Sequence, residues 1–314
     1  MNSLFRSALV LFGLMFLLSQ PLQLQASALT NGTTPVTTSD GVALYVRVAG
    51  KGTPCVFVHG GPGAGSYGFE KLAGQPLEEK LQMIYVDQRG SGRSASDAKL
   101  NYSLERQVED LEEIRQQLHL EKWVVMAHSF GGIIATAYAQ KYPQHVQALI
   151  LVNSILNLPA AMESTTSYGY NLLPAATRPP LDAAAPLPQR YFMVLAMLQQ
   201  QKLYNQLQYA SDSTAARVNR VMKDQTSNHD FAANMFKAPG RYVQDFTPAT
   251  ASLTMPVLVL TGQQDYMTGP EHYKSFRFPQ QRVVVLPGKH MPFLDNPKEF
   301  NQAVQGFVRK LPRR

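Results

Sequence analysis

Short apolar runs recur along the chain, separated by segments with a different spacing of apolar side chains. Most runs are nearly continuous in Val, Leu, Ile, Met and Phe, which is typical of strands that are buried on both faces. The expected strands occupy residues 43–49, 54–59, 82–87, 122–127, 146–152, 257–261 and 282–286. Helical segments lie between them, so the pattern predicts an α/β protein with a mostly parallel central sheet and helices on both faces.

The intervening segments have the spacing of amphipathic helices. In residues 104–118 the apolar positions recur every three or four residues, and Ser103 is placed to cap the N-terminus of that helix. Residues 130–142 form a second expected helix, which stops before Pro143 because proline cannot continue a helix. Residues 297–311 form the last one.

The pattern breaks between residues 153 and 247, where no buried strand is evident. Residues 174–188 are rich in proline and alanine, which predicts an irregular loop, whereas residues 191–209 and 215–223 have helical spacing. We therefore expect a helical cap inserted before the last two strands and lying over the sheet edge where ligands bind. The expected domains are a core of residues 29–152 and 248–314 and a cap of residues 153–247.

The N-terminal segment has the features of a secretory signal peptide. Arg6 supplies a positive charge, residues 7–18 are apolar, and Ala26-Ser27-Ala28 is a cleavage pattern. An uncleaved membrane anchor is the alternative, but the apolar run is shorter than the ~20 residues that span a bilayer. We expect cleavage of residues 1–28 after Ala28 and a periplasmic or secreted protein without a stable membrane anchor.

Composition and charge change this picture little. The chain is 45% hydrophobic and 16% charged, which suits a globular protein with a sizeable core. Its net charge of +7 comes from scattered Lys and Arg residues, without the basic stripe of a nucleic-acid-binding protein. The single cysteine, Cys55, lies in an apolar run and is expected to be a small buried side chain.

The strongest local signal for chemistry is Ser129, which lies between an expected strand and an expected helix. Small residues around a serine permit the sharp turn that exposes a nucleophilic hydroxyl, and Ala127 replaces the usual first glycine. The N–H groups at the start of the helix point toward the same place. An ordinary helix N-cap is the alternative interpretation. The motif reads Ala127-His128-Ser129-Phe130-Gly131-Gly132.

A nucleophilic serine needs a base, and the base needs an acid that orients it. After such a serine, the acid and then the histidine follow in the chain, each just beyond a strand. Asp265 and His290 meet both conditions, so we predict that they form a catalytic triad with Ser129. Asp295 and Asp245 are weaker candidates for the acid. Other histidines lie in expected helices, turns or the cap, namely His119, His145, His229 and His272.

Acyl transfer also needs backbone N–H donors that stabilise the developing oxyanion. One donor is expected from Phe130, the residue after the nucleophile. The second is expected from Gly61, because glycines let the backbone approach a substrate closely. Gly61 lies in the loop His59-Gly60-Gly61-Pro62-Gly63.

That loop, together with a second motif, resembles the proline iminopeptidase (prolyl aminopeptidase) group of α/β hydrolases. The second motif is Asp87-Gln88-Arg89-Gly90-Ser91-Gly92-Arg93-Ser94. The stretch from Gly288 to Pro297 looks like the histidine loop of α/β hydrolases in general. The resemblance implies the α/β-hydrolase fold, Ser129 as nucleophile, His290 as base, Asp265 as orienting acid, and a helical cap that gates the pocket.

The sequence departs from that group where the substrate's amine would bind. The group carries Trp or Tyr after the nucleophile and glutamates in a Trp-bearing cap, whereas this chain has Phe130, a single cap glutamate, Glu163, and no cap Trp. Weak candidates for substrate binding are Glu163, Tyr168, Tyr170 and Tyr191, and the aspartates that could replace glutamates are Asp182, Asp212, Asp224, Asp230 and Asp245. Asp87 and Arg89 are interpreted as a structural pair in a charged turn.

The sequence therefore predicts a serine hydrolase that acts on a small molecule or a short peptide. Peptides with a short or proline N-terminus are one substrate class, and esters or lactones are the other. A non-catalytic binding protein on the same fold is the alternative of another class. No metal-ligand pattern and no nucleotide-binding motif is visible, so no cofactor or metal is expected. The sequence gives no prediction of the oligomeric state.

Overall fold

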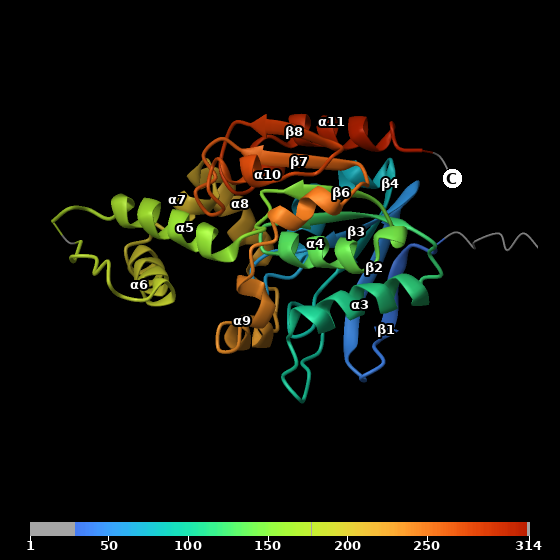
Figure 1. Ribbon diagram of the computed structural model, residues 1–314, viewed down its shortest axis with the longest axis horizontal. Coiled ribbons are helices and arrows are strands. Elements are labelled where there is room, and N and C mark those ends of the chain that lie inside the picture. The colour runs from blue at the N-terminus through green and yellow to red at the C-terminus, as the bar shows by residue number, and fades with distance from the viewer. Residues whose placement is uncertain (1–28, 177, 313–314) are drawn as a thin grey trace, which may run out of the picture.

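The computed structural model describes residues 29–176 and 178–312. The expected signal peptide and its cleavage site lie outside these residues. The core is an eight-stranded sheet with the strand order β1-β2-β4-β3-β5-β6-β7-β8 (Figure 1). Strands β1 and β4 are antiparallel to β2, and the remaining pairs are parallel. The strands are β1 Gly32–Thr37, β2 Ala43–Gly50, β3 Thr53–Val58, β4 Leu81–Val86, β5 Trp123–His128, β6 Val146–Val152, β7 Val257–Gly262 and β8 Gln281–Leu286.

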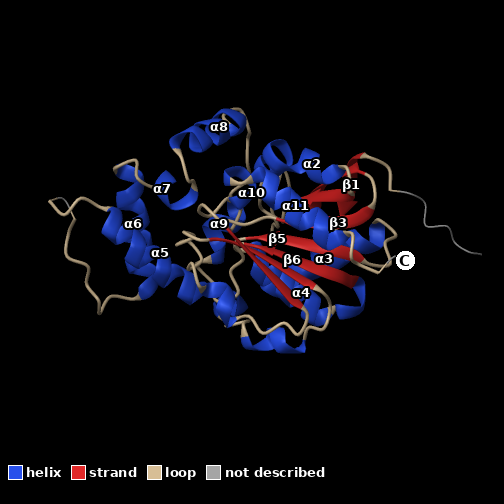
Figure 2. Cartoon of the chain, turned by 90° about the horizontal axis from the view of Figure 1, so that it is seen from above, coloured by secondary structure: helices blue, strands red, loops and turns tan. Residues whose placement is uncertain are grey.

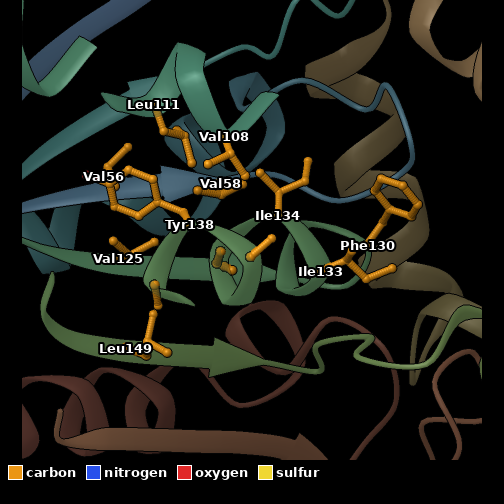
Figure 3. Packing of buried hydrophobic residues seen from close by; sticks show 14 of the residues in the cluster. Val56, Val58, Val108, Leu111, Val125, Phe130, Ile133, Ile134, Tyr138 and Leu149 are labelled. Carbon is orange, nitrogen blue, oxygen red and sulfur yellow. The ribbon is translucent and has the colours of Figure 1, made fainter. Parts of the chain in front are cut away.

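Helices cover both faces of the sheet, as the continuous apolar strands predict. Val56 and Val58 of β3 point to the face covered by α3 (Leu104–Gln117) and α4 (Gly131–Lys141), where they join Val108 and Tyr138 (Figure 3). The alternate residues Cys55 and Phe57 belong to the opposite cluster. That cluster also includes residues of η1 (Glu70–Gly74), α2 (Gln75–Glu78), α10 (Pro292–Asp295) and α11 (Pro297–Val308).

The cap segment contains helices and no β-strand among its described residues, as expected. Figures 1 and 2 show these helices gathered beyond one end of the sheet. The Ser164 hydroxyl of the cap donates to the carbonyl of Tyr266, and His290 N–H donates to the carbonyl of Gln208, so the cap contacts the loops after β7 and β8. The helices are α5 Leu158–Leu172, α6 Leu187–Gln200, α7 Asn205–Gln208, α8 Asp212–Met222 and α9 Asp230–Met235.

Most element positions match the sequence pattern, with some differences at particular residues. Ser103 caps α3, since its hydroxyl accepts from Arg106 N–H at 3.3 Å. The single helix expected over residues 191–209 is wrong: α6 ends before Lys202, which has a φ of +59°, and α7 follows as a separate turn. Strand β1 and helices α5 and α9 were not expected. Strand β1 buries only one side chain, Val36, and therefore lacks a hydrophobic signal.

No helix in the described ranges is long and apolar enough to span a membrane. Short loops and helices connect the strands, among them α1 (Tyr67–Phe69) and the 3-10 turns Pro143–His145, Gly240–Val243, Pro248–Ser252 and His272–Ser275.

Asp87 and Arg89 are structural residues, as expected, but they do not pair with each other. The Asp87 carboxylate accepts from Arg93 Nε at 2.7 Å, whereas the buried Arg89 guanidinium binds three other carboxylates. Its distances to Asp40, Asp97 and Asp110 are 2.9, 2.9 and 2.6 Å. Sequence proximity suggested the wrong partners because the motif turns sharply and directs these side chains into two separate networks.

Replacing Arg89 with methionine is expected to destabilise the fold by about 3–5 kcal/mol, because the buried carboxylates of Asp97 and Asp110 would lose the cation that they share. Chemical denaturation of the purified protein measures this change. An Arg241→Met variant is the matched control, because Arg241 lies at the surface with an exposed Glu105 partner, and such pairs contribute about 0–1 kcal/mol. Equal losses in the two variants would contradict the importance of the buried network.

We expect the protein to lose stability in acid. The hydrogen bond from Arg89 lowers the pKa of Asp40 below its usual value. Burial by itself raises the pKa of Asp87, but Arg93 and His59 outweigh burial and lower this pKa overall. These carboxylates therefore contribute to the free energy of unfolding. Their contribution is fully present above the unfolded-state pKa of ~4 and is lost as the pH falls toward their lower pKa values in the folded state. Denaturation at pH 7 and pH 3 should show this loss, and Asp40→Asn should reduce it. A free energy of unfolding that is constant between these pH values would refute the prediction.

Candidate active site

Ser129 lies at a sharp turn between β5 and α4. Its φ is +53°, a left-handed conformation that is strained for any residue with a side chain. The Ser129 N–H donates to the Val152 carbonyl at 3.1 Å, and the Ser129 carbonyl accepts from the N–H groups of Gly132 and Ile155. A Cβ at Gly131 would collide with the Val58 carbonyl, which explains the small residues after the serine.

The structure brings the three predicted side chains together. His290 Nε2 is 2.9 Å from Ser129 Oγ, and His290 Nδ1 is 2.9 Å from Asp265 Oδ1. All three residues are buried. A carboxylate only accepts hydrogen bonds, so Nδ1 carries the proton toward Asp265, and Nε2 is left with a lone pair for the serine hydroxyl. This is the tautomer that a general base needs.

Asp265 is held as a carboxylate by several donors. Thr268 Oγ1 donates at 2.6 Å, and the N–H groups of Met267 and Thr268 donate at 3.1 and 3.3 Å. Burial by itself raises the pKa of Asp265, but the charge and N–H of His290 and the Thr268 hydroxyl outweigh burial and lower it. Asp265 is therefore ionised at neutral pH.

The other candidate acids and histidines lie elsewhere. Asp295 accepts from the N–H groups of Ala210 and Lys289, and Asp245 accepts from Thr247, so neither is bonded to His290. His272 Nε2 accepts from Leu156 N–H at 3.0 Å and fixes the start of the cap. The geometry thus selects Asp265 among the sequence candidates.

Sequence reasoning missed His128, although it directly precedes Ser129. His128 Nε2 is 2.9 Å from the His290 carbonyl oxygen, and the two imidazole rings are 4.8 Å apart. Burial lowers the pKa of His128 to about 3, so the ring is neutral and its Nε2–H donates to that carbonyl. The ring therefore positions the backbone of His290. Its place beside Ser129 in the motif was the only available signal.

The glycine loop after β3 passes beside Ser129, as expected. A Cβ at Gly60 would lie 2.7 Å from Ser129 Cβ and 3.0 Å from the His128 carbonyl oxygen, so only glycine fits there. Gly61, the expected oxyanion donor, follows with a φ of +121°. Phe130, the other expected donor, directly precedes α4, and its ring packs against Phe231 and Tyr242. The sequence had not distinguished the role of Gly60.

A cavity of about 240 Å³ lies beside this loop. Its lining comes from β3 and the segment after it, the end of β5, the cap residues around α7 and α8, and the residues after His290. The residues are Phe57, His59, Gly60, Ala64, Gly65, Gly68, Phe69, Leu72, His128, Gln208, Tyr209, Val218, Met222, Met291, Phe293 and Leu294. Most are apolar, and the group of Phe57, Phe69 and Phe293 packs ring against ring.

The weak substrate-binding candidates do not line this cavity. Glu163 is 49% exposed and binds Arg190 at 2.9 Å. The Tyr168 ring stacks on Tyr266 at 3.8 Å, and the Tyr170 hydroxyl donates to the Pro179 carbonyl. Tyr191 is half-buried and packs against the larger core cluster. In the part of the chain that the structure describes, no group of three or more His, Cys, Asp or Glu residues could hold a metal ion.

Comparisons with known proteins place the chain in one family. Residues 53–297 match the family described as alpha/beta hydrolase fold. The proline iminopeptidase of Heyndrickxia coagulans is 25% identical over 83% of this chain and 92% of its own length. That of Neisseria gonorrhoeae is 34% identical, but over only 35% of either chain.

Solved structures also share the fold, among them the following two. A proline iminopeptidase-related protein from Thermus thermophilus has a TM-score of 0.74 and 22% identity, covering 90% of this chain and 98% of that one. An esterase from Exiguobacterium antarcticum has a TM-score of 0.65 and 21% identity, covering 88% of this chain and 99% of that one. The chain therefore belongs to the alpha/beta hydrolase fold family and is a hydrolase that resembles the proline iminopeptidases.

Proposed function

We propose that this protein is a serine hydrolase that works through an acyl-enzyme on Ser129. The observation that carries the proposal is the continuous contact from Ser129 Oγ through the His290 ring to Asp265, with both distances at 2.9 Å. Such an arrangement lets the histidine remove a proton from the hydroxyl as it attacks a carbonyl. A binding protein on the same fold has no need of it.

In the first half of the reaction, Ser129 Oγ bonds to the substrate carbonyl carbon while His290 Nε2 takes the hydroxyl proton. The N–H groups of Gly61 and Phe130 stabilise the oxyanion, and Asp265 stabilises the charged imidazole. His290 then gives its proton to the leaving group as the scissile bond breaks. In the second half, His290 takes a proton from water as the water oxygen bonds to the acyl carbon. His290 then returns this proton to Ser129 Oγ as the bond between Oγ and the acyl carbon breaks, and the carboxylic acid is released.

Labelling with a fluorophosphonate probe tests this proposal, because the probe reacts covalently with an activated serine. We expect labelling of the wild-type protein and none of a Ser129→Ala variant. A folded wild-type protein that resists the probe, or a variant that is labelled equally, would support a non-catalytic binding protein instead.

Carboxylic esters, lactones included, are the substrates that the site favours. A buried ammonium group needs a paired carboxylate. Among the residues that line the cavity there is no Asp or Glu, and Glu163 already binds Arg190 near the surface. The candidate cap aspartates offer no substitute: Asp230 accepts from Ser96, and the others are exposed, namely Asp182, Asp212, Asp224 and Asp245.

Short peptides with an N-terminal proline are the second candidate, supported by the resemblance to proline iminopeptidases. Comparing hydrolysis of a proline arylamide with that of a short-chain aryl ester separates the two. We expect a higher kcat/KM for the ester. A higher kcat/KM for the amide would reverse the order of the candidates.

We also propose that the protein is exported and cleaved after Ala28. The N-terminal pattern supports this, and the folded part can begin directly at Leu29, whose carbonyl accepts from the Gln82 side chain at 2.7 Å. N-terminal sequencing of the protein from a periplasmic or culture fraction should begin at Leu29. A protein that keeps Met1 in the cytoplasm would exclude export.

A further inference from the structure

We propose that the cavity beside Ser129 is the acyl pocket, that it takes an uncharged, medium-length acyl chain, and that Val218 and Met222 of α8 set the chain length. The inference rests on the proposed serine hydrolase function and specifies its substrate class. It assigns a specificity role to one helix of the cap.

The cavity begins next to the nucleophile. Gly60 and His128 both line it, and both adjoin Ser129: His128 precedes it in the chain, and a Cβ at Gly60 would lie 2.7 Å from Ser129 Cβ. Met291, directly after His290, lines it as well. A group attached to a carbonyl carbon on Ser129 Oγ would therefore enter the cavity past residues that adjoin the serine and the histidine.

The chemistry of the lining suits an uncharged chain. Phe57, Phe69, Leu72, Phe293 and Leu294 supply its apolar inner wall. None of the residues that line it is Asp, Glu, Lys or Arg. The cavity therefore offers no partner for a charged substrate group, and burying such a group there would be costly.

The two lining histidines carry no charge into the cavity. The nitrogens of His59 are occupied, Nδ1 by the Gly60 carbonyl at 2.9 Å and Nε2 by Gln88 N–H at 3.0 Å. Burial keeps the pKa of His59 and His128 below the usual value. Both rings are therefore neutral at pH 7 and compatible with an aliphatic chain.

The inner position of the cavity fits the acyl group better than the leaving group. The leaving group takes a proton from His290 Nε2 and departs before water enters at the same place. The acyl group stays bound through both steps. A cavity walled by Phe57, Phe69 and Phe293 of the buried core cluster suits the part that is retained.

Helix α8 closes the cavity from the cap. Val218 and Met222 are half-buried, and Met222 Sδ lies 3.4 Å from the position of a Cβ on Gly68. At roughly 30 Å³ for each small group, 240 Å³ holds a chain of about six to eight carbons. Changing the volume of either side chain should therefore change the longest acyl chain that fits.

The test is the acyl-length profile of kcat/KM for p-nitrophenyl esters from two to twelve carbons, at constant leaving group. For the wild type we expect a rise of roughly fourfold for each methylene, as apolar surface is buried, then a fall beyond about eight carbons. Val218→Phe should move the optimum to shorter chains and Met222→Ala to longer ones, by two carbons or more.

Matched controls are Val243→Phe, at an exposed position, and Met197→Ala, in the α5–α6 cluster; both lie away from the cavity and should leave the profile unchanged. A second series varies the alcohol of acetate esters and should give the same profile in all variants. Thermal denaturation checks that each variant is folded.

Opposite shifts of the acyl optimum in the two cavity variants, with unchanged controls, support the pocket. If hydrolysis depends on Ser129 but every variant has the same acyl profile, the assignment of the acyl pocket is wrong and the serine hydrolase proposal stands. The same conclusion follows if the cavity variants change the profile of the alcohol series instead. If the wild-type protein neither hydrolyses esters nor reacts with the fluorophosphonate probe, both the acyl pocket and the serine hydrolase function are wrong.

Discussion

Replacing Ser129 with alanine or with glycine is expected to lower kcat/KM for an ester substrate by about 10⁴–10⁶-fold. The reaction needs a hydroxyl oxygen to bond to the acyl carbon, and neither variant has one. Residual rates over the uncatalysed reaction should remain, because the oxyanion donors and the binding site are still present. Steady-state kinetics on purified protein measures the loss, and a reduction of tenfold or less would exclude Ser129 as the nucleophile.

The same two variants should differ in stability. Ser129 has a φ of +53°, which costs roughly 1–2 kcal/mol for a residue with a Cβ. Alanine keeps that strain and glycine avoids it, although glycine also makes the unfolded chain more flexible by about 0.5–1 kcal/mol. We therefore expect the Ser129→Gly variant to be more stable than Ser129→Ala by up to about 1.5 kcal/mol.

Thermal denaturation of both inactive variants tests the strain directly. Both variants lack the Ser129 hydroxyl, so a difference in Tm between them reflects the change from alanine to glycine alone. A Ser129→Gly variant that melts below Ser129→Ala would show that the strain at this turn is smaller than the cost of the flexibility that glycine adds to the unfolded chain. A difference in the expected direction would mean that the geometry of the nucleophile is maintained at a cost in stability.

The parts of the fold with strong local signals could be predicted from the sequence. Strand β6 occupies residues 146–152 as expected, because continuous apolar residues between two turns leave little ambiguity. The contact of Ser129, His290 and Asp265 was predictable for a related reason. In a parallel sheet the ends of successive strands meet at one edge, so residues just after β5, β7 and β8 converge despite their separation in the chain.

The features that sequence could not supply depend on contacts between distant segments. The cavity combines Phe57, Val218 and Met291, which no local pattern connects. Glu163 remained a candidate for amine binding until the structure showed its ion pair with Arg190. Arg89 was expected to pair with Asp87, but its partners in the structure are Asp40, Asp97 and Asp110. The partners of a long charged side chain depend on the tertiary structure around it, and the spacing of apolar residues along the sequence does not predict them.

Replacing Asp265 with asparagine is expected to lower kcat by about 10³–10⁴-fold while the protein stays folded. Asparagine has nearly the same shape, but its amide offers N–H donors where the carboxylate only accepts. Thr268 Oγ1 donates to Oδ2 of Asp265, whereas the Met267 N–H donates to Oδ1, the oxygen that faces His290 Nδ1. An asparagine whose oxygen keeps the 2.6 Å contact with Thr268 Oγ1 places its amide nitrogen at the Oδ1 position. Its NH₂ group would then face His290 Nδ1.

That contact would favour the wrong tautomer of His290. With Nδ1 accepting from the amide, the proton moves to Nε2, and the ring can no longer take a proton from the Ser129 hydroxyl. The charge that stabilises the imidazolium is lost as well. Asp295→Asn is the matched control, because Asp295 also lies near the histidine loop but accepts from the N–H groups of Ala210 and Lys289.

Kinetic comparison of the two variants therefore separates an orienting acid from a merely neighbouring one. Asp295→Asn should keep kcat within several-fold of the wild type, since it can disturb His290 only through the loop. If Asp295→Asn caused the larger loss, the acid would be misassigned. The 2.9 Å contact between His290 Nδ1 and Asp265 Oδ1 predicts the opposite result, because the ring's tautomer depends on that one hydrogen bond.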